Sequence, residues 1–204
     1  MSLDRFNQLA KKWDSKPERV EGALCFVDEI FKTIKEDTSN FNTLDYGCGS
    51  GLVSFALMEQ VKTVTGMDFS TGMIDVYNQK IKSLKFNNIS SLLHDINNQE
   101  LDFNTYDLAV TNMTMHHIKD TNIFIKKLSS SLKPNGYLCI ADLEIEDGTF
   151  HSCNDGVEHF GFNINNIEKS YKDNNLKNII VKQLQVINKP NNNFSVFIAI
   201  GQKI

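Results

Sequence analysis

Short apolar segments alternate with amphipathic stretches along most of this chain, and that alternation restricts the fold more than any other feature. Five segments are predicted to be strands, at residues 41–46, 62–68, 89–93, 106–111 and 137–141. Apolar residues at helical spacing fill the intervals, as at Phe124, Leu128 and Leu132. Strands that alternate with helices form right-handed crossovers and a mostly parallel sheet covered on both faces.

The C-terminal part of the chain departs from this alternation of strands and helices. Residues 179–187 and 194–200 are predicted strands, and the Asn188–Asn193 connection between them is too short for a crossover helix. They should therefore form an antiparallel hairpin, after a short helix near residues 163–175. The predicted fold class is α/β, a doubly wound, mostly parallel seven-stranded sheet with a C-terminal antiparallel hairpin. Lys133–Gly136 is predicted to be a turn into the fifth strand.

The 204 residues are expected to form one domain. Residues 1–38 are expected to be a helical N-terminal segment, and residues 142–162 a long polar loop.

Composition excludes several classes of function. A net charge of −4 does not suggest the basic surface that nucleic-acid binding requires. The polar N-terminus has no signal-peptide pattern, and no apolar run is long enough for a membrane span. The four cysteines form no CxxC pair, so neither a disulfide framework nor a zinc ribbon is expected. These features favour a cytoplasmic protein.

A glycine cluster follows the first predicted strand, in the sequence Leu-Asp-Tyr-Gly-Cys-Gly-Ser-Gly at residues 44–51. A strand, a tight turn and a helix N-terminus place free backbone N–H groups at the carboxyl edge of the sheet, where ligands of such folds bind. No lysine follows Gly51, as a nucleoside-triphosphate loop would require, and the GxGxG spacing differs from the dinucleotide GxGxxG. The remaining ligand class is a nucleoside with a compact charged tail.

Two carboxylates end the next two strands at the same edge. Asp68 ends the second strand and can accept hydrogen bonds from both ribose hydroxyls. Asp95 ends the third strand and can accept one from an exocyclic amine, while Phe69 and Ile96 pack on a flat ring. The edge thus offers a glycine turn, a ribose-binding acid and a base-reading acid in successive units.

These motifs together resemble class I S-adenosylmethionine-dependent methyltransferases, in particular the small-molecule subgroup similar to the ubiquinone/menaquinone biosynthesis methyltransferases. The matching segments are residues 44–51, 67–70, 94–96, 106–112 with 115–117, and 132–138, and the terminal hairpin is also typical of the family. The resemblance implies a Rossmann-like methyltransferase fold, S-adenosylmethionine as cofactor, S-adenosylhomocysteine as product and in-line methyl transfer to a small-molecule acceptor. It also implies that the N-terminal segment around Trp13 covers the cofactor and that the 142–162 loop lies on the substrate side.

The resemblance, with the residue arguments above, nominates a set of cofactor-binding residues. They are Trp13, Asp45, Gly47, Cys48, Gly49, Gly51, Asp68, Phe69, Ser70, Met73, His94, Asp95, Ile96, Asn112, Met113 and His116. Residues 112–115, Asn-Met-Thr-Met, differ from the Asn-Pro-Pro-Tyr type of motif that accompanies amine methylation on bases or glutamine. This difference argues against nucleic-acid and protein-amide substrates.

His117 and His159 are the candidate catalytic residues, as a general base for an acceptor that must lose a proton. The 142–162 loop also contains His151, Cys153, Asp155 and Glu158, whose spacing matches no standard metal signature. No metal site is therefore expected, and the loop is interpreted as a polar lid over the acceptor.

Two other functions stay open at this stage: a catalytically inactive cofactor-binding regulator or partner subunit, and an oxidoreductase that uses NAD or a nucleotide sugar. The residues do not distinguish a carbon, oxygen, nitrogen or sulfur acceptor, nor a monomer from a homodimer.

Overall fold

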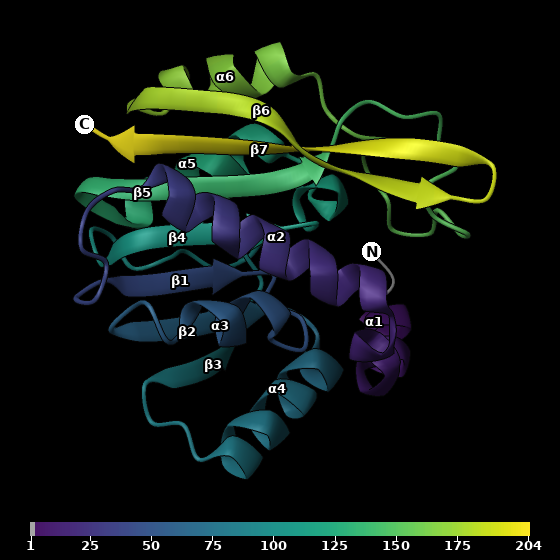
Figure 1. Cartoon of the computed structure of the whole chain (residues 1–204), viewed down its shortest axis with the longest axis horizontal. Coiled ribbons are helices and arrows are strands. Elements are labelled where there is room, and N and C mark those ends of the chain that lie inside the picture. Colours follow the sequence, from purple (N-terminus) through teal and green to yellow (C-terminus); the bar gives the residue numbers. More distant parts are fainter. Residues whose placement is uncertain (1–2) are drawn as a thin grey trace.

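Seven strands form one mixed sheet in the computed structural model, which describes residues 3–204 (Figure 1). The strands are β1 (Asn42–Tyr46), β2 (Thr63–Asp68), β3 (Ile89–Leu93), β4 (Tyr106–Asn112), β5 (Leu132–Leu143), β6 (Leu176–Lys189) and β7 (Asn192–Lys203). Their order is β3-β2-β1-β4-β5-β7-β6. The first five are mutually parallel, and β7 pairs antiparallel with both β5 and β6. The predicted fold class is confirmed.

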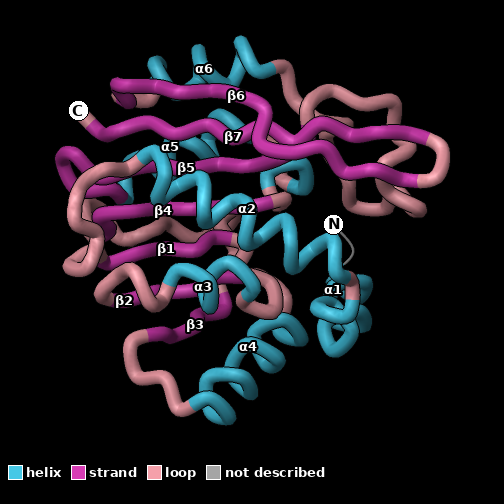
Figure 2. The backbone as a smooth tube through the Cα atoms, viewed as in Figure 1, coloured by secondary structure: helices cyan, strands magenta, loops and turns pink. Residues whose placement is uncertain are grey.

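Helices cover both faces of the sheet (Figure 2). They are α1 (Leu3–Leu9), η1 (Ala10–Ser15, a 3-10 helix), α2 (Pro17–Thr33), α3 (Leu52–Leu57), α4 (Thr71–Leu84), η2 (Met115–His117, also 3-10), α5 (Thr121–Ser131) and α6 (Ile164–Asp173). The hydrophobic core has two layers. One lies under α2, α3 and α4, and the other under α5 and α6.

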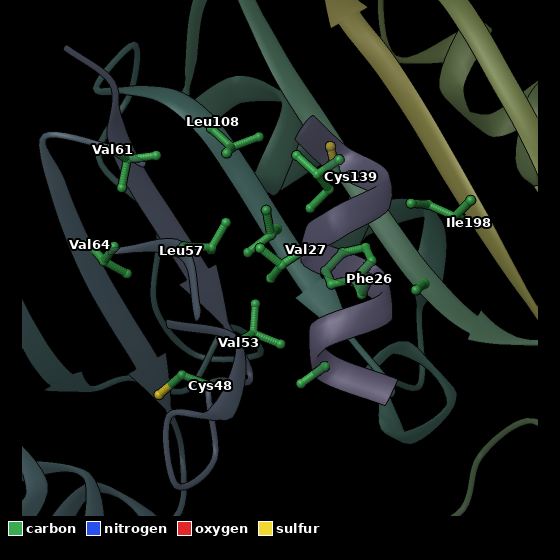
Figure 3. Close-up of a cluster of buried hydrophobic side chains, with 14 of the residues drawn as sticks. Phe26, Val27, Cys48, Val53, Leu57, Val61, Val64, Leu108, Cys139 and Ile198 are labelled. Atoms are coloured by element: carbon green, nitrogen blue, oxygen red, sulfur yellow. The ribbon is translucent and has the colours of Figure 1, made fainter. Parts of the chain in front are cut away.

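The alternation of side chains along a strand connects the sequence to these two layers. In β4, Leu108 and Val110 join the layer under α2, whereas Ala109 between them joins the layer under α5 and α6. Because both faces are covered, the strand is apolar on both sides. Figure 3 shows the first layer, where Phe26 and Val27 of α2 lie over the sheet.

Two boundaries differ from the sequence expectation. Lys133–Gly136, predicted to be a turn, lies within β5 as an irregular excursion. Tyr106 pairs with Leu132, and Leu108 with Tyr137, with Asn135 at φ +65°. The terminal hairpin is longer than expected, so that only Pro190 and Asn191 separate β6 from β7. In the hairpin, pairing of Asn188 with Asn193 and of Lys189 with Asn192 extends the two strands through residues expected to form the turn.

The carboxyl ends of β1, β2 and β4 point toward the end of the sheet where α1 and η1 lie, beside the start of α4 (Figure 1). Across residues 3–204, no helix combines the length and hydrophobicity that crossing a membrane would require.

Candidate active site

The glycine turn after β1 places its three glycines in left-handed backbone conformations, with φ of +72°, +53° and +96° at Gly47, Gly49 and Gly51. Two of the three glycines pack closely against side chains. A Cβ at Gly47 would lie 2.2 Å from Oγ1 of Thr114, and one at Gly51 would lie 2.6 Å from the Phe55 ring. These two positions therefore require glycine for packing as well as for backbone conformation.

Gly49 is different because its surroundings leave room for an added carbon atom. A Cβ there would find its nearest atoms at 3.9 Å, in the Met73 sulfur and in Nε1 of Trp13. The Asp68 carboxylate borders the same space and accepts hydrogen bonds from the Gly49 N–H at 2.9 Å and the Ser70 N–H at 2.8 Å. Burial raises the pKa of Asp68 despite these bonds. We call this arrangement of the Gly49 backbone, the Asp68 carboxylate and the Trp13 indole the cradle.

Asp45 lies beneath the glycine turn and is 1% exposed. Its carboxylate accepts a hydrogen bond from the Ser54 hydroxyl at 2.5 Å. Burial raises the pKa of Asp45 to about 7. The folded protein therefore retains this proton at pH values where the unfolded chain has released it.

We expect Asp45→Asn to flatten the pH dependence of stability. In the wild type the raised pKa makes the free energy of unfolding fall as pH rises from about 4, the usual pKa of Asp, to about 7. At pH 8 the variant should be more stable by on the order of 2–4 kcal/mol, and near pH 4 the two proteins should be similar. Urea unfolding of ligand-free protein at both pH values measures this, with the exposed Asp75→Asn as control. Parallel pH profiles for Asp45→Asn and wild type would contradict it.

The N-terminal roof, formed by α1 and η1, is attached to the glycine turn and to α4. Oδ1 of Asn7 accepts hydrogen bonds from the Ser70 hydroxyl at 2.7 Å and from the Gly72 N–H at 2.8 Å. Asp14 accepts hydrogen bonds from the Ser50 hydroxyl and the Lys80 ammonium. Neither Asn7 nor Asp14 was selected from the sequence, since nothing local marks a residue whose partners are more than thirty positions away.

Aromatic rings line the underside of this roof. The Phe6 ring lies 5.8 Å from that of Trp13, 6.0 Å from Phe69 and 5.3 Å from His117, measured between centroids. The Arg19 guanidinium stacks on the Trp13 ring, 3.6 Å from its centroid. The sequence prediction included Trp13, Phe69 and His117 but missed Phe6.

The nominated adenine-side residues are engaged within the protein. His94 is buried, with its ring nitrogens 3.2 Å from the Tyr46 hydroxyl and 3.3 Å from the Glu100 carbonyl. The Asp95 carboxylate accepts hydrogen bonds from the loop that follows it, including 2.7 Å from Nδ2 of Asn98. Ile96 is part of the buried core. Both ring nitrogens of His94 therefore have partners within the protein.

The other nominated residues border the turn or support it. Cys48 is buried in the core, and Ser70 caps α4 by accepting a hydrogen bond from the Met73 N–H at 3.2 Å. At the end of β4, Asn112 is followed by Met113 in a left-handed conformation, with φ of +54°. This bend turns the chain directly into η2, which carries His116 and His117.

Three imidazoles meet at η2: His116 and His117 of η2 itself, and His151 of the loop after β5. We call them the histidine cluster. Their ring centroids lie 4.1, 5.0 and 5.7 Å apart. Nδ1 of His116 donates to Oδ1 of Asp142 at 2.7 Å, and Nδ1 of His117 donates to the Gly156 carbonyl at 2.7 Å. Burial, and then the neighbouring His116, lower the pKa of His117 to about 3, and burial lowers that of His151 to about 4.

The connection between β5 and α6 brings His151 to this cluster. The loop spans residues 144–162, because β5 continues to Leu143. Its backbone is attached beside η2, where the N–H groups of Glu158 and His159 donate to the His116 carbonyl at 2.9 and 3.1 Å. Nε2 of His159 donates to the Ile118 carbonyl at 2.9 Å, so this ring is held outside the histidine cluster.

Residues 37–183 match the family model described as a methyltransferase domain. This chain belongs to the methyltransferase domain family. The match covers most of the sheet and confirms the class I methyltransferase family that the sequence motifs indicated.

Two relatives of this methyltransferase-family chain illustrate the relationship. An uncharacterized methyltransferase of Schizosaccharomyces pombe is 33% identical over 175 residues, covering 74% of this chain and 62% of the relative. A ubiquinone biosynthesis O-methyltransferase of Rickettsia typhi is 30% identical over 151 residues, covering 69% and 59%. The chain thus spans about six tenths of the length of these relatives.

The fold is similar to that of a Haemonchus contortus phosphoethanolamine N-methyltransferase solved with phosphomonomethylethanolamine and S-adenosylhomocysteine. The TM-score is 0.73 at 18% sequence identity, over 87% of this chain and 52% of the other. At this identity the similarity concerns the fold alone.

Proposed function

We propose that this protein is an S-adenosylmethionine-dependent methyltransferase that acts on a small-molecule acceptor by in-line transfer. The observation that carries the proposal is the cradle at Gly49, which among the three glycines of the turn leaves room for an added carbon atom, next to Trp13 and beside the Asp68 carboxylate. A nucleoside with a compact charged tail fits this combination of a glycine turn, an acid and an aromatic roof.

The residues around the cradle fit the cofactor by their chemistry. The Asp68 carboxylate would accept hydrogen bonds from ribose hydroxyls, and the backbone at Gly47–Gly49 would hold the amino-acid part. Trp13 and Phe69 would contact the apolar parts of the nucleoside from the roof side. The methyltransferase domain match supports this assignment at the level of the family.

The main task of the protein is to align the methyl donor with the acceptor. When bound, S-adenosylmethionine supplies a methyl group already activated on a positively charged sulfur. The roof residues Phe6 and Trp13 exclude water, and the end of β4 with η2 holds the acceptor side. Holding two reactants in line can contribute about 7–11 kcal/mol to lowering the barrier.

Neither candidate base is well suited to remove a proton. The pKa of about 3 makes His117 a weak base at pH 7, since an effective general base has a pKa near the working pH. His159 commits its Nε2 to the Ile118 carbonyl. The proposal therefore assigns His117 to the wall of the acceptor site and assigns no base.

Two observations favour a small molecule as acceptor. The net charge of −4 is unsuited to a nucleic-acid surface. The relatives also include an enzyme named for O-methylation in ubiquinone biosynthesis, a small-molecule reaction. The acceptor would enter between the N-terminal roof and the 144–162 loop.

Calorimetry with S-adenosylmethionine and S-adenosylhomocysteine tests the cofactor assignment. Incubation with small hydroxyl, thiol and amine acceptors, followed by mass spectrometry, tests transfer. Methylated product distinguishes an enzyme from an inactive cofactor-binding protein. Binding of NAD in place of both adenosyl ligands would contradict the proposal.

We expect Asp68→Ala to weaken the binding of S-adenosylhomocysteine by about 10- to 100-fold, because hydrogen bonds to a charged group contribute about 1.5–3 kcal/mol. Asp75→Ala, at an exposed position on α4, is the control and should bind like wild type. Equal dissociation constants for wild type and Asp68→Ala, measured on folded proteins, would contradict the assignment.

A further inference from the structure

We propose that His116, His117 and His151 bind one divalent transition-metal ion, with a coordination position left open on the acceptor side. This goes beyond the proposed function, and the spacing of these residues predicts no metal site. The set could not be recognised from spacing, because two ligands follow β4 and the third lies in the 144–162 loop.

The distances suit a metal. The three rings can each offer one nitrogen, and these atoms all lie within 4.8 Å of one another. Around a tetrahedral zinc ion with bonds of 2.0–2.1 Å, ligand nitrogens are about 3.3 Å apart. His151 is only partly buried and belongs to a loop, so a small side-chain movement is enough to close the set.

Hydrogen bonds outside the cluster orient two of the rings. His116 donates from Nδ1 to the Asp142 carboxylate, and His117 donates from Nδ1 to the Gly156 carbonyl. Metal-binding histidines characteristically donate their other ring N–H to a carboxylate or a backbone carbonyl in this way. Both bonds leave Nε2 as the atom with an available lone pair.

The buried polar atoms point to the same conclusion. His116 is 1% exposed, and its Nε2 has no hydrogen-bond partner among the described residues. Nε2 of His151 is also buried and unpartnered there. Leaving buried polar atoms unpaired is unfavourable, and coordination of one ion would satisfy both.

The type of ligand restricts which metal ions can bind. Three imidazoles suit zinc, nickel, copper or iron, whereas magnesium and calcium require oxygen ligands. The Asp142 carboxylate contacts the cluster through His116, and the Arg5 and Lys189 cations act on His151. A set of three protein ligands is typical of catalytic zinc sites, which keep the fourth position for water or substrate.

The open position gives the ion a role that rests on the proposed function. His117 lies beside Phe6 of the roof, so the cluster borders the part of the site that the roof covers. An acceptor hydroxyl or thiol bound to the ion would lose its proton to solvent water more readily. This would supply the activation that the weakly basic His117 does not.

Cobalt titration of untagged, metal-free protein tests the site without cofactor or acceptor. We expect one Co²⁺ per chain, with the visible absorption of a low-symmetry four- or five-coordinate site, and displacement by Zn²⁺. His151→Gln and His117→Gln should each weaken binding more than about 100-fold, beyond the effect of losing an outer hydrogen bond. His159→Gln, in the same loop but outside the cluster, is the matched control and should bind like wild type.

Asp142→Asn should weaken binding by about 10- to 100-fold, as loss of an outer carboxylate does. Thermal unfolding of each metal-free variant verifies that the protein is folded. The proposal is overturned if wild type binds no Co²⁺, if His151→Gln binds as wild type does, or if a thiolate-to-cobalt band shows that cysteine is a ligand. Because binding is measured without S-adenosylmethionine, failure here would leave the methyltransferase proposal standing, and loss of cofactor binding would leave this one standing.

Discussion

Gly49→Ala is expected to weaken the binding of S-adenosylmethionine by more than about 100-fold, a loss of at least about 2.7 kcal/mol. The new methyl group would project into the space between the Trp13 indole and the Met73 sulfur, 3.9 Å from each. The protein itself has room for this methyl group, and the cofactor would have to share it. The stability loss should be limited to the strain of a left-handed alanine, about 1–2 kcal/mol. Calorimetry and thermal unfolding on the same preparation separate the two effects.

Two glycines serve as controls for that experiment. Gly148 has φ of +83° in the 144–162 loop, and a Cβ there would lie 3.4 Å from Phe160, so Gly148→Ala should have similar strain but normal cofactor binding. Gly47→Ala would place Cβ 2.2 Å from Thr114 and should destabilise the fold more than Gly49→Ala does. If folded Gly49→Ala bound the cofactor like wild type, the cradle would not be the cofactor site.

Phe26→Ala is expected to lower the free energy of unfolding by about 3–5 kcal/mol. The Phe26 side chain is 0% exposed and lies between α2 and the sheet, among the residues of Figure 3. Its removal would leave a cavity, because α2 is held in place by neighbouring contacts and can collapse only in part. Urea unfolding followed by circular dichroism measures the change.

Leu24→Ala is the matched control for Phe26→Ala. Leu24 lies in the same helix but is 51% exposed, so its truncation should change stability by less than about 0.5 kcal/mol. Similar losses for the two variants would mean that α2 does not depend on its buried face for stability.

Much of the proposed cofactor site could be predicted from the sequence because its key residues follow strands. Gly47, Gly49 and Asp68 come directly after or at the end of β1 and β2, and parallel neighbours deliver their ends to one edge. The local pattern of apolar residues was enough to predict those strands. What the sequence did not indicate is that the His94 ring would lie against the Tyr46 hydroxyl and the Glu100 carbonyl.

Residues brought in from distant segments could not be predicted in the same way. Asn7 and Asp14 attach the roof to the site through side chains that have no periodic pattern. His151 was interpreted as part of a polar lid, and its proximity to His116 depends on how the 144–162 loop folds back onto η2. Loops have no repeating pattern of burial, so their path is decided by long-range contacts.

The sequence by itself determined the doubly wound sheet, the terminal hairpin and the edge that carries the glycine turn, because these depend on periodic burial and on turn residues that act locally. Only the tertiary structure decided which glycine has room for an added carbon atom, which rings form the roof and which histidines meet. The physical reason is that each of these depends on distances between side chains far apart in the chain, which close packing sets only after the layers have assembled.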